Sequence, residues 1–421
     1  MDRDVQDFFD LINALDDHPF APARQLFNTK ADLIVSRAPG RLDVMGGIAD
    51  YSGSHVLEFP IAEATFVALQ PANERRLNIV TLLDDEPHHS SFTMSLSDLD
   101  EYETAREFFN GRWAAYVAGV FLVLMRERNQ RFESGANILI SSRVPPGKGV
   151  SSSAALEVAV MQAVTVAFDI EIDGREKALL CQRVENLVVG APCGVMDQMT
   201  SVFGECDRLL LLLCQPAELK RMITLPPQLM LWGIDSGIRH SVGGSDYGTV
   251  RAAASTGTRV IADLKPDFSE HGYLANISPA EFEREYLDLL PERIRMPTAH
   301  PIYENVRVQR FVELLETNEG YDELGELMYE AHRSYTALGL NSTGTDLIVD
   351  LVRKEAGLFG AKITGGGSGG TVAVLGDQTS RAAIERVVDR YAKETCHQPY
   401  VFSGSSPGAL AFGSLRVSID R

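Results

Sequence analysis

A glycine- and serine-rich stretch, PPGKGVSSSAAL, occupies residues 145–156. It lies between an apolar, β-branched segment at 136–144 and a segment of helical pattern at 152–168 that is apolar almost all round. Glycines let backbone N–H groups approach an anion, a helix N-terminus adds partial positive charge, and hydroxyls can ligate a metal. A capped helix after a Pro-Gly turn explains one serine but not three. The stretch therefore predicts a phosphate-binding loop, although it is not the GxxxxGK[ST] motif.

Two further glycine-rich stretches flank it in the sequence. Residues 37–51, RAPGRLDVMGGIADY, follow a predicted strand and bring three glycines close to Arg41, Asp43 and Asp50, although a turn with solvated charges fits the same pattern. Residues 360–372, GAKITGGGSGGTV, hold five glycines in six positions and run into an apolar strand. So much glycine is costly in chain entropy and is expected where backbone passes close to another backbone or to a ligand. The strand directly after it argues against a flexible linker.

Two carboxylates follow the phosphate-loop stretch. Glu185 lies on a helical pattern that ends at Gly190, and Asp197 follows a loop that contains Pro192 and Gly194. Such a pair can divide the work, one carboxylate holding a metal and the other handling a proton. Spacing alone makes this a hypothesis.

Length and composition limit the class of protein. A chain of 421 residues predicts two domains, and the mixture of strand-like and helix-like segments favours an α+β fold. Pro226 and Pro227 suggest a division into 1–226 and 227–421. Strands are expected at 136–144, 208–213, 229–235 and 370–375, and helices at 152–168, 177–189 and 308–316.

Charge and apolar content exclude several partners. The net charge is −19 and no Lys/Arg cluster occurs, so no nucleic-acid partner is expected. The longest apolar runs are far shorter than the roughly 20 residues that cross a bilayer, so no membrane partner is expected. Five cysteines without CxxC spacing indicate neither a disulfide framework nor a zinc site. The acidic first 15 residues lack a signal-peptide pattern, and a cytoplasmic location is expected.

The four motif segments, in this order, resemble the GHMP small-molecule kinases, named for galactokinase, homoserine kinase, mevalonate kinase and phosphomevalonate kinase. Residues 37–51, Met196-Asp-Gln198 and 232–247 are similar to the galactokinase branch, and MGGIADYSGS at 45–54 most resembles L-arabinokinases. The resemblance implies an α+β, two-domain fold with mixed and antiparallel sheets and flanking helices. It places the active site in the cleft between the domains.

The resemblance also implies a role for particular residues. Asp197 matches the catalytic carboxylate beside the sugar C1 hydroxyl, Arg41 matches its neighbouring arginine, and Mg²⁺ would lie between Glu185 and Ser153. Lys148 fits either a phosphate contact or a solvated side chain. Sugar contacts are expected from Asp50, Gly194 and Tyr247, and ATP contacts from Pro145, Gly147, Lys148, Gly149, Ser151, Ser152, Ser153, Ala154, Gly365, Gly366 and Gly367.

One departure from the family pattern concerns the sugar. Galactokinases carry an acidic residue and a histidine where this chain has Gly47 and Ile48, and those side chains contact the sugar around its C6 hydroxymethyl group. L-Arabinopyranose has the ring configuration of galactopyranose without C6. The resemblance therefore implies a kinase that uses MgATP to phosphorylate L-arabinose at its anomeric hydroxyl.

Three alternatives remain open at this point. A galactokinase is the nearest one. A glucuronokinase would need a cation near the C6 carboxylate, for which Arg239 is the candidate. A non-catalytic sugar sensor is disfavoured, because the serine loop, Arg41, Glu185 and Asp197 are all present.

Overall fold

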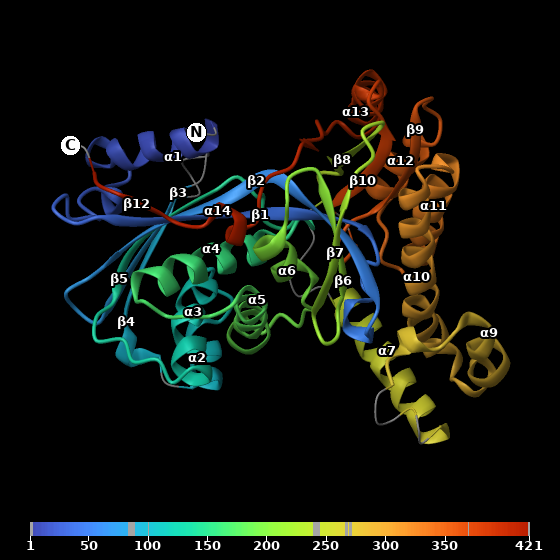
Figure 1. Cartoon of the computed structure of the whole chain (residues 1–421), viewed down its shortest axis with the longest axis horizontal. Coiled ribbons are helices and arrows are strands. Elements are labelled where there is room, and N and C mark those ends of the chain that lie inside the picture. Colours follow the sequence, from blue (N-terminus) through green and yellow to red (C-terminus); the bar gives the residue numbers. More distant parts are fainter. Residues whose placement is uncertain are drawn as a thin grey trace.

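The computed structural model of the chain describes residues 3–82, 89–99, 101–238, 245–265, 268, 272–368 and 370–419. At residues 245 and 246 it describes the backbone only. Two β-sheets organise these residues (Figure 1). The larger sheet has the strand order β12-β1-β2-β5-β3-β4, with β6 and β7 attached through β2, and the smaller has the order β11-β8-β10-β9.

The strands of the two sheets come mainly from different parts of the chain. All the pairings are antiparallel except that of β3 with β5, so the predicted mixed and antiparallel architecture is confirmed. The larger sheet comprises β1 (Leu33–Met45), β2 (His55–Pro71), β3 (Arg76–Leu82), β4 (Ser90–Ser95), β5 (Ala136–Ser142), β6 (Arg208–Leu213), β7 (Glu218–Thr224) and β12 (Leu415–Val417); the smaller comprises β8 (Leu229–Asp235), β9 (Leu358–Ile363), β10 (Thr371–Asp377) and β11 (Val401–Ser403).

Helices cover the faces of both sheets. The longer ones are α1 (Arg3–Asn13), α2 (Tyr102–Phe109), α3 (Ala114–Glu127), α4 (Ser152–Ala167), α5 (Gly174–Arg183), α6 (Met196–Phe203), α7 (Ser245–Leu264), α10 (Glu292–Thr317), α11 (Tyr321–Ala337), α12 (Thr343–Val352) and α13 (Arg381–Thr395). Short helices are α9 (Pro279–Glu281) and α14 (Ala409–Phe412), the π-helices η6 (Val184–Val189) and η8 (Phe282–Tyr286), and the 3₁₀ turns η1 (Leu15–Asp17), η2 (Ala21–Ala23), η3 (Asp50–Ser52), η5 (Leu96–Asp98), η7 (Leu274–Asn276) and η9 (Leu287–Leu289).

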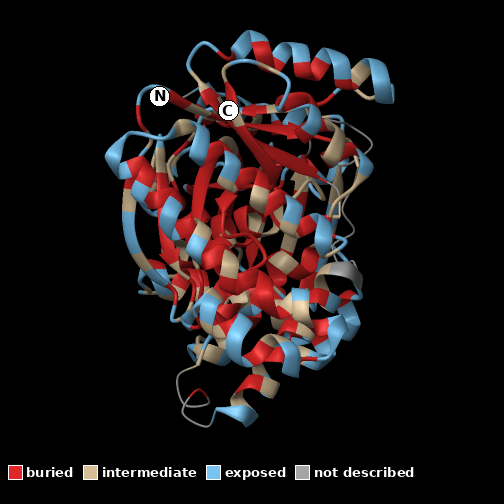
Figure 2. Cartoon of the chain, turned by 90° about the vertical axis from the view of Figure 1, so that its right-hand side faces the viewer, coloured by how far each residue is buried: buried red, intermediate tan, exposed pale blue. Residues whose placement is uncertain are grey.

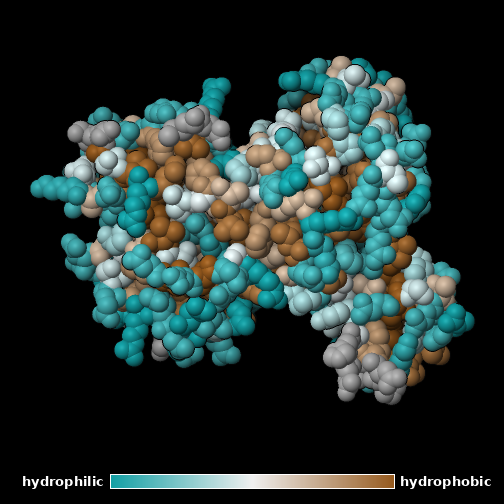
Figure 3. Space-filling model, in the orientation of Figure 1, coloured by the Kyte–Doolittle hydropathy of each residue, from teal (hydrophilic) through white to brown (hydrophobic). Residues whose placement is uncertain are grey.

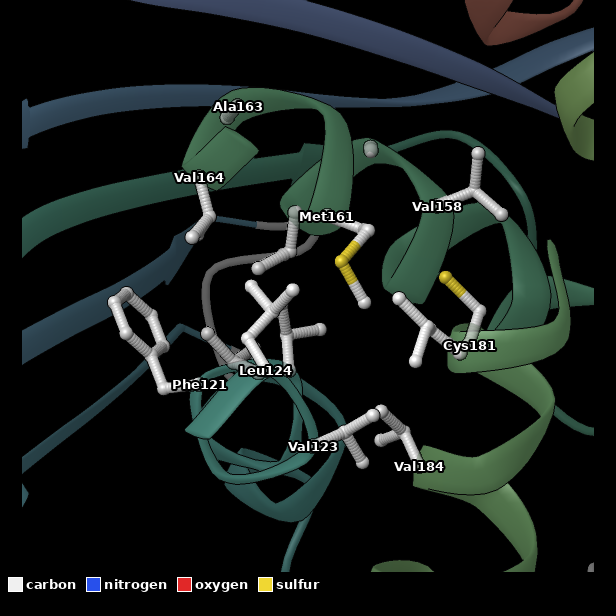
Figure 4. Close-up of a cluster of buried hydrophobic side chains, with 14 of the residues drawn as sticks. Phe121, Val123, Leu124, Val158, Met161, Ala163, Val164, Cys181 and Val184 are labelled. Carbon is white, nitrogen blue, oxygen red and sulfur yellow. The ribbon is translucent and has the colours of Figure 1, made fainter. Parts of the chain in front are cut away.

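Helices α3 and α4 form the interior of the part built on the larger sheet. A helix that is apolar on every side must be buried, and α4 is buried along almost its whole length. Side chains of α3, α4 and α5 meet there, among them Leu124, Met161 and Cys181 (Figure 4). Each large apolar side chain buried in this way contributes roughly 1.5–3 kcal/mol. The same packing fixes the position of the N-terminus of α4, which directly follows the serine loop.

The outer helices are buried on one face only, as Figure 2 shows. Figure 3 shows hydrophilic side chains over most of one face of the molecule and apolar ones largely in recesses between them. Within the described part of the chain, no helix is both long enough and apolar enough to cross a membrane.

The change from one sheet to the other falls between Thr224, where β7 ends, and Leu229, where β8 begins. The proposed division at 226/227 lies in this interval and remains a prediction. The C-terminal segment, however, returns to the larger sheet, because β12 pairs with β1 through Leu33 and Val417. Two continuous halves therefore do not describe the strand pairing fully.

Candidate active site

A cavity of about 290 Å³ brings together the motif segments from distant parts of the sequence. Its walls come from the end of β1, the loop between β5 and α4, η6, the loop before α6, the start of α7 and the glycine loop after β9. The lining residues are Arg41, Ile48, Asp50, Gly147, Gly149, Ser151, Ser152, Ser153, Glu185, Ala191, Pro192, Cys193, Gly194, Met196, Asp197, Tyr247, Gly248 and Gly366.

The serine loop presents unused hydrogen-bonding groups to this cavity. Ser151 precedes α4 with φ +62°, in the left-handed region, and its side chain makes no capping hydrogen bond. Its Oγ is buried and has no hydrogen-bond partner. The first N–H groups of a helix also lack intrahelical acceptors. This end of the cavity therefore suits the oxygen atoms of phosphate groups.

The third glycine loop packs directly on the serine loop. A Cβ on Gly365 would lie 2.8 Å from the carbonyl oxygen of Gly149, and one on Gly149 would lie 3.0 Å from the carbonyl oxygen of Thr364. Both glycines have positive φ. The many glycines of this loop were expected where backbone passes close to another backbone or to a ligand, and the first of these is observed.

Not every residue expected at ATP lines the cavity. Gly147, Gly149, Ser151, Ser152, Ser153 and Gly366 do, whereas Pro145, Lys148, Ala154, Gly365 and Gly367 are not among its lining residues. Lys148 is neither solvated nor at the cavity, because its Nζ lies 2.7 Å from Oδ2 of Asp235 on β8. That ion pair connects the serine loop to the smaller sheet.

Arg41 and Asp197 form the polar centre of the cavity. Arg41 Nη2 and Nε donate to Oδ1 of Asp197 at 2.7 and 3.0 Å, and Nη1 donates to the carbonyl oxygen of Gly149 at 2.7 Å. Arg41 is almost fully buried, whereas the Asp197 side chain remains 22% exposed. Both of these contacts are to Oδ1 of Asp197, so Asp197 retains Oδ2 for another partner.

Three further buried charged residues, Glu58, Asp43 and Lys362, lie next to Arg41 on the side away from the cavity or pair with one another. Arg41 Nε lies 3.2 Å from Oε2 of Glu58, and Lys362 Nζ lies 2.7 Å from Oδ2 of Asp43. The side chains of Glu58, Asp43 and Lys362 are all fully buried. Burial, together with the charge of Asp43, raises the pKa of Glu58 well above its usual range, while Arg41 opposes this shift. Lys362 is on β9, so these charges join the smaller sheet to β1 and β2.

Glu185 lies in the π-helix η6, at the phosphate end of the cavity. Burial and the charge of Asp197 raise the pKa of Glu185 to about 7, against hydrogen bonds from Ser153, Cys193 and Gln198 that lower it. Gln198 Nε2 donates to Glu185 Oε2 at 2.9 Å. The expected neighbours Ser153 and Glu185 therefore do lie together. π-Helical turns within helices are frequent at functional sites.

Asp50, Tyr247, Gly194 and Ile48, which were expected at the sugar, also line the cavity. Burial and the charge of Asp197 raise the pKa of Asp50 to about 6. A Cβ on Gly194 would collide with the Asp50 carboxylate, so glycine is required beside it. Ile48 is 1% exposed and has φ +52°.

The role of Gly47 in the choice of sugar stays a prediction. Gly47 does not line the cavity, and a Cβ there would collide with Oδ2 of Asp43 and the hydroxyl of Tyr335. Glycine at this position makes room for the buried Asp43–Lys362 pair. Arg239, the candidate cation for a uronic acid, lies outside the described residues.

Sequence analysis missed the supporting charges. Glu58 and Lys362 stand in otherwise apolar strands, which was the available signal, since a charge in a buried strand needs a buried partner. Tyr335 was also missed; its hydroxyl donates to the carbonyl oxygen of Gly365 at 2.8 Å. Cys193 of the cavity wall was not expected there, and Met196 was noted only as part of the Met196-Asp-Gln198 match.

Comparisons with known proteins identify the family of this chain. The GHMP kinases N terminal domain matches residues 115–205, the GHMP kinases C terminal domain matches 311–394, and the galactokinase galactose-binding signature matches 24–71. The galactokinase of Lactococcus lactis complexed with galactose superposes with a TM-score of 0.80 at 21% identity, over 91% of this chain and 95% of that one. Mevalonate kinase of Methanococcus jannaschii gives a TM-score of 0.62 at 16% identity, over 88% of this chain and 97% of that one.

Two curated relatives are closer in sequence. L-arabinokinase of Arabidopsis thaliana is 43% identical over 93% of this chain, which spans only 47% of that protein's length. Galactokinase of Chloroflexus aurantiacus is 31% identical over 90% of this chain and 94% of its own length. The family matches and the galactokinase relative together indicate the class of phosphotransferases with an alcohol acceptor. The chain belongs to the GHMP kinase family, in the branch that contains the galactokinases.

Proposed function

We propose that the protein transfers the γ-phosphoryl group of ATP to the C1 hydroxyl of L-arabinose, giving ADP and L-arabinose 1-phosphate. The hydroxyl oxygen attacks the γ-phosphorus, the bond from that phosphorus to the β–γ bridging oxygen breaks, and ADP leaves with the electron pair. The proton of the hydroxyl goes to Asp197. The family match and the plant relative support this reaction class.

Asp197 and Arg41 have the geometry for this step. A carboxylate that accepts the proton of an attacking hydroxyl typically contributes about 10²- to 10⁴-fold to the rate. Asp197 is partly exposed to the cavity, and two donors of Arg41 on Oδ1 hold the carboxylate in place with Oδ2 left for the substrate hydroxyl. The guanidinium also lies where it can offset charge on the transferred group.

The phosphate end fits nucleotide and Mg²⁺. A Ser151 hydroxyl without a partner, the N-terminus of α4 and the glycines at 147 and 149 supply donors for phosphate oxygens. Glu185 and Ser153 would hold Mg²⁺, which usually takes only one or two protein carboxylates beside waters and substrate phosphates. Mg²⁺ when bound would neutralise phosphate charge. The described residues contain no group of three or more His, Cys, Asp or Glu side chains that could hold a metal ion. Binding of Mg²⁺ through one carboxylate, a hydroxyl, waters and phosphates does not require such a group.

Ile48 is the observation that carries the choice of sugar. A β-branched residue rarely adopts φ near +52°, and such strain persists where the surrounding structure enforces it, often at functional sites. At position 48 it places an apolar, buried side chain in the wall of the cavity that is proposed to face the sugar. An apolar wall suits a pentose that lacks the C6 hydroxymethyl group. D-Galactose is the second candidate, favoured by the galactose-binding signature at 24–71 and the galactokinase relatives.

Product analysis tests this proposal. Incubation with MgATP and L-arabinose is expected to yield ADP and one phosphate ester, whose ³¹P signal couples to the anomeric proton. Asp197→Asn, which has nearly the same shape, is expected to lower kcat about 10²-fold or more. Arg259→Gln, on the exposed side of α7, serves as the control. An ester at another carbon, or full activity of Asp197→Asn, would contradict the proposal.

A further inference from the structure

A second cavity, of about 260 Å³, shares a wall with the active site. Asp50, Cys193 and Gly194 line both cavities. The remaining walls come from α5, the start of α7 and the loop that follows β6; their residues include Arg175, Gln182, Arg251, Tyr51 and Gln215. This volume is many times the roughly 10–15 Å³ that one water needs on the same measure, so the cavity can hold a small molecule.

Two arginines face this cavity, and the charge of Arg251 opposes the rise in the pKa of Asp50 that burial and Asp197 cause. Within the described chain, neither Arg175 nor Arg251 forms an ion pair, and Asp50 is the one carboxylate that lines the space. Arg175 donates to the carbonyl oxygens of Pro216 and Ala217. The guanidinium of Arg251 stacks over the ring of Tyr51 at 5.9 Å. In a chain of net charge −19, two cations facing a cavity with one carboxylate leave a local excess of positive charge.

Two donors in this cavity are also unused. Arg251 Nη1 is buried and has no hydrogen-bond partner, and the hydroxyl of Tyr51 is buried and equally unpartnered. Leaving such groups unsatisfied is costly, so a ligand rich in acceptors is favoured here. Arginine binds oxyanions of phosphate type with several parallel hydrogen bonds.

We propose that this second cavity is a binding site for a small phosphate-type oxyanion, with Arg251 and Tyr51 as its donors and Arg175 as a supporting charge. It is separate from the loop proposed for the phosphates of ATP, and it goes beyond the proposed kinase activity. The anion is either free inorganic phosphate or the phosphoryl group of a phosphorylated sugar.

Because Asp50 lines both cavities, an anion in the second cavity changes the charge around a residue of the active site. A second negative charge beside Asp50 disfavours its ionised form, because like charges raise the pKa of a carboxyl group. Asp50 is the carboxylate expected to accept sugar hydroxyls. Occupation of the second cavity is therefore expected to raise the KM for sugar more than it lowers kcat.

Calorimetric titration with inorganic phosphate tests the site directly. The full chain is first saturated with ADP, so that the serine loop is occupied, and phosphate is then added. One remaining site is expected, and Arg251→Gln should weaken it about 10-fold or more, as expected for the loss of a charged hydrogen bond. Arg259→Gln removes the same charge from the exposed side of the same helix and should change the Kd by less than about 2-fold.

A second variant and a second probe complete the test. Tyr51→Phe removes only the hydroxyl and should weaken phosphate binding in the same direction. Tighter binding of L-arabinose 1-phosphate than of phosphate, lost in Arg251→Gln, would identify a sugar phosphate as the ligand of the second cavity. Phosphate binding that Arg251→Gln weakens, with L-arabinose 1-phosphate binding that Arg251→Gln leaves unchanged, would identify free phosphate. Phosphate binding that ADP abolishes entirely, or that neither variant weakens, would overturn the proposed site. If ADP itself fails to bind, the kinase proposal fails, whereas the comparison of wild type with Arg251→Gln still decides this one.

Discussion

Ile48 is the residue on which the proposed choice of sugar depends. Its positive φ costs about 1–3 kcal/mol for a β-branched residue, and a glycine would adopt the same backbone without strain. The side chain lines the cavity and packs in a buried apolar cluster with Val250 and Tyr335, at the wall proposed to face the C6 position of a hexose. The cost in stability is consistent with a gain in selectivity.

Replacement of Ile48 by glycine should separate these two effects. Ile48→Gly is expected to leave the melting temperature nearly unchanged, since relief of backbone strain offsets lost apolar burial. The ratio of kcat/KM for L-arabinose to that for D-galactose should fall about 10-fold or more, within the usual range for a methylene-sized change. Ile48→Val, which keeps the β-branch, is the control. An unchanged ratio in Ile48→Gly would show that position 48 does not select the sugar.

Asp50 predicts a pH dependence of sugar binding. Its pKa of about 6 means that the carboxylate becomes protonated as the pH falls through 6, and a protonated group accepts sugar hydroxyls less well. The KM for sugar should therefore rise below pH 6 and level off above pH 7. Steady-state kinetics between pH 5 and 8 measure this, and Asp50→Asn should raise KM at every pH and remove the acidic limb. A limb that persists in Asp50→Asn would assign the titration to another group.

At the scale of elements, β9 acts on the active site through Lys362. This residue directly precedes the third glycine loop, and its ion pair with Asp43 places that loop against β1. Thr364 Oγ1 accepts a hydrogen bond from the backbone N–H of Asp43 at 2.6 Å, which fixes the same register. The buried charged residues beside Arg41 therefore link strand pairing to its position.

Removal of the Lys362 charge should impair both stability and turnover. Lys362→Met leaves Asp43 unpaired in the interior, and breaking a buried pair costs about 3–5 kcal/mol. Urea denaturation should show that loss, and kcat should fall more than KM rises, because Arg41 shifts relative to Asp197. The double variant Asp43→Asn/Lys362→Met should recover part of both losses. Equal effects of Lys362→Met and the exposed Lys220→Met would contradict this role.

How far sequence analysis reached is also clearest in the elements. The segments expected at 136–144 and 152–168 are β5 and α4 to within two residues, since apolar pattern and flanking turns fix them locally. The helix expected at 308–316 is only the end of α10, which begins at Glu292 and runs through Pro297 and Pro301. Packing against α7 and α11 overrides the local preference of proline. The helix expected at 177–189 is divided into α5 and the π-helix η6, a distinction that no local pattern shows.

The candidate site was predictable where its chemistry is local. The serine loop, Asp197, Glu185 and Asp50 follow from motif and resemblance. The pairing of Asp43 with Lys362 joins residues more than 300 positions apart in the sequence. The position of Gly47 against Asp43 and Tyr335 depends on how the chain turns after β1. Local sequence patterns do not show which residues of distant strands will face each other.

At the scale of the whole molecule, the C-terminal segment joins the two sheets. After β11 of the smaller sheet the chain crosses to α14 and to β12, which pairs with β1. Arg37 on β1 donates to Ser406 Oγ at 3.0 Å and to the carbonyl oxygen of Pro407 at 3.3 Å. This return holds the larger sheet against the part built on the smaller one.

Truncation after Ser403 should therefore destabilise the protein. It exposes the edge of β1 at Leu33–Val35 and leaves Arg37 without two acceptors, so the melting temperature should fall by about 3 °C or more. Calorimetry measures the change, with Arg416→Ala as a control that keeps the strand. An unchanged melting temperature would show that the returning segment contributes little.

The central claim concerns the reaction and its sugar, and one comparison tests it most directly. Purified protein with MgATP should be assayed for kcat/KM on L-arabinose and on D-galactose under identical conditions. We predict a higher kcat/KM for L-arabinose, because the apolar Ile48 lines the cavity at the wall proposed to face the sugar and offers no partner to a C6 hydroxyl. An equal or higher kcat/KM for D-galactose would contradict the assignment of this pocket to a pentose.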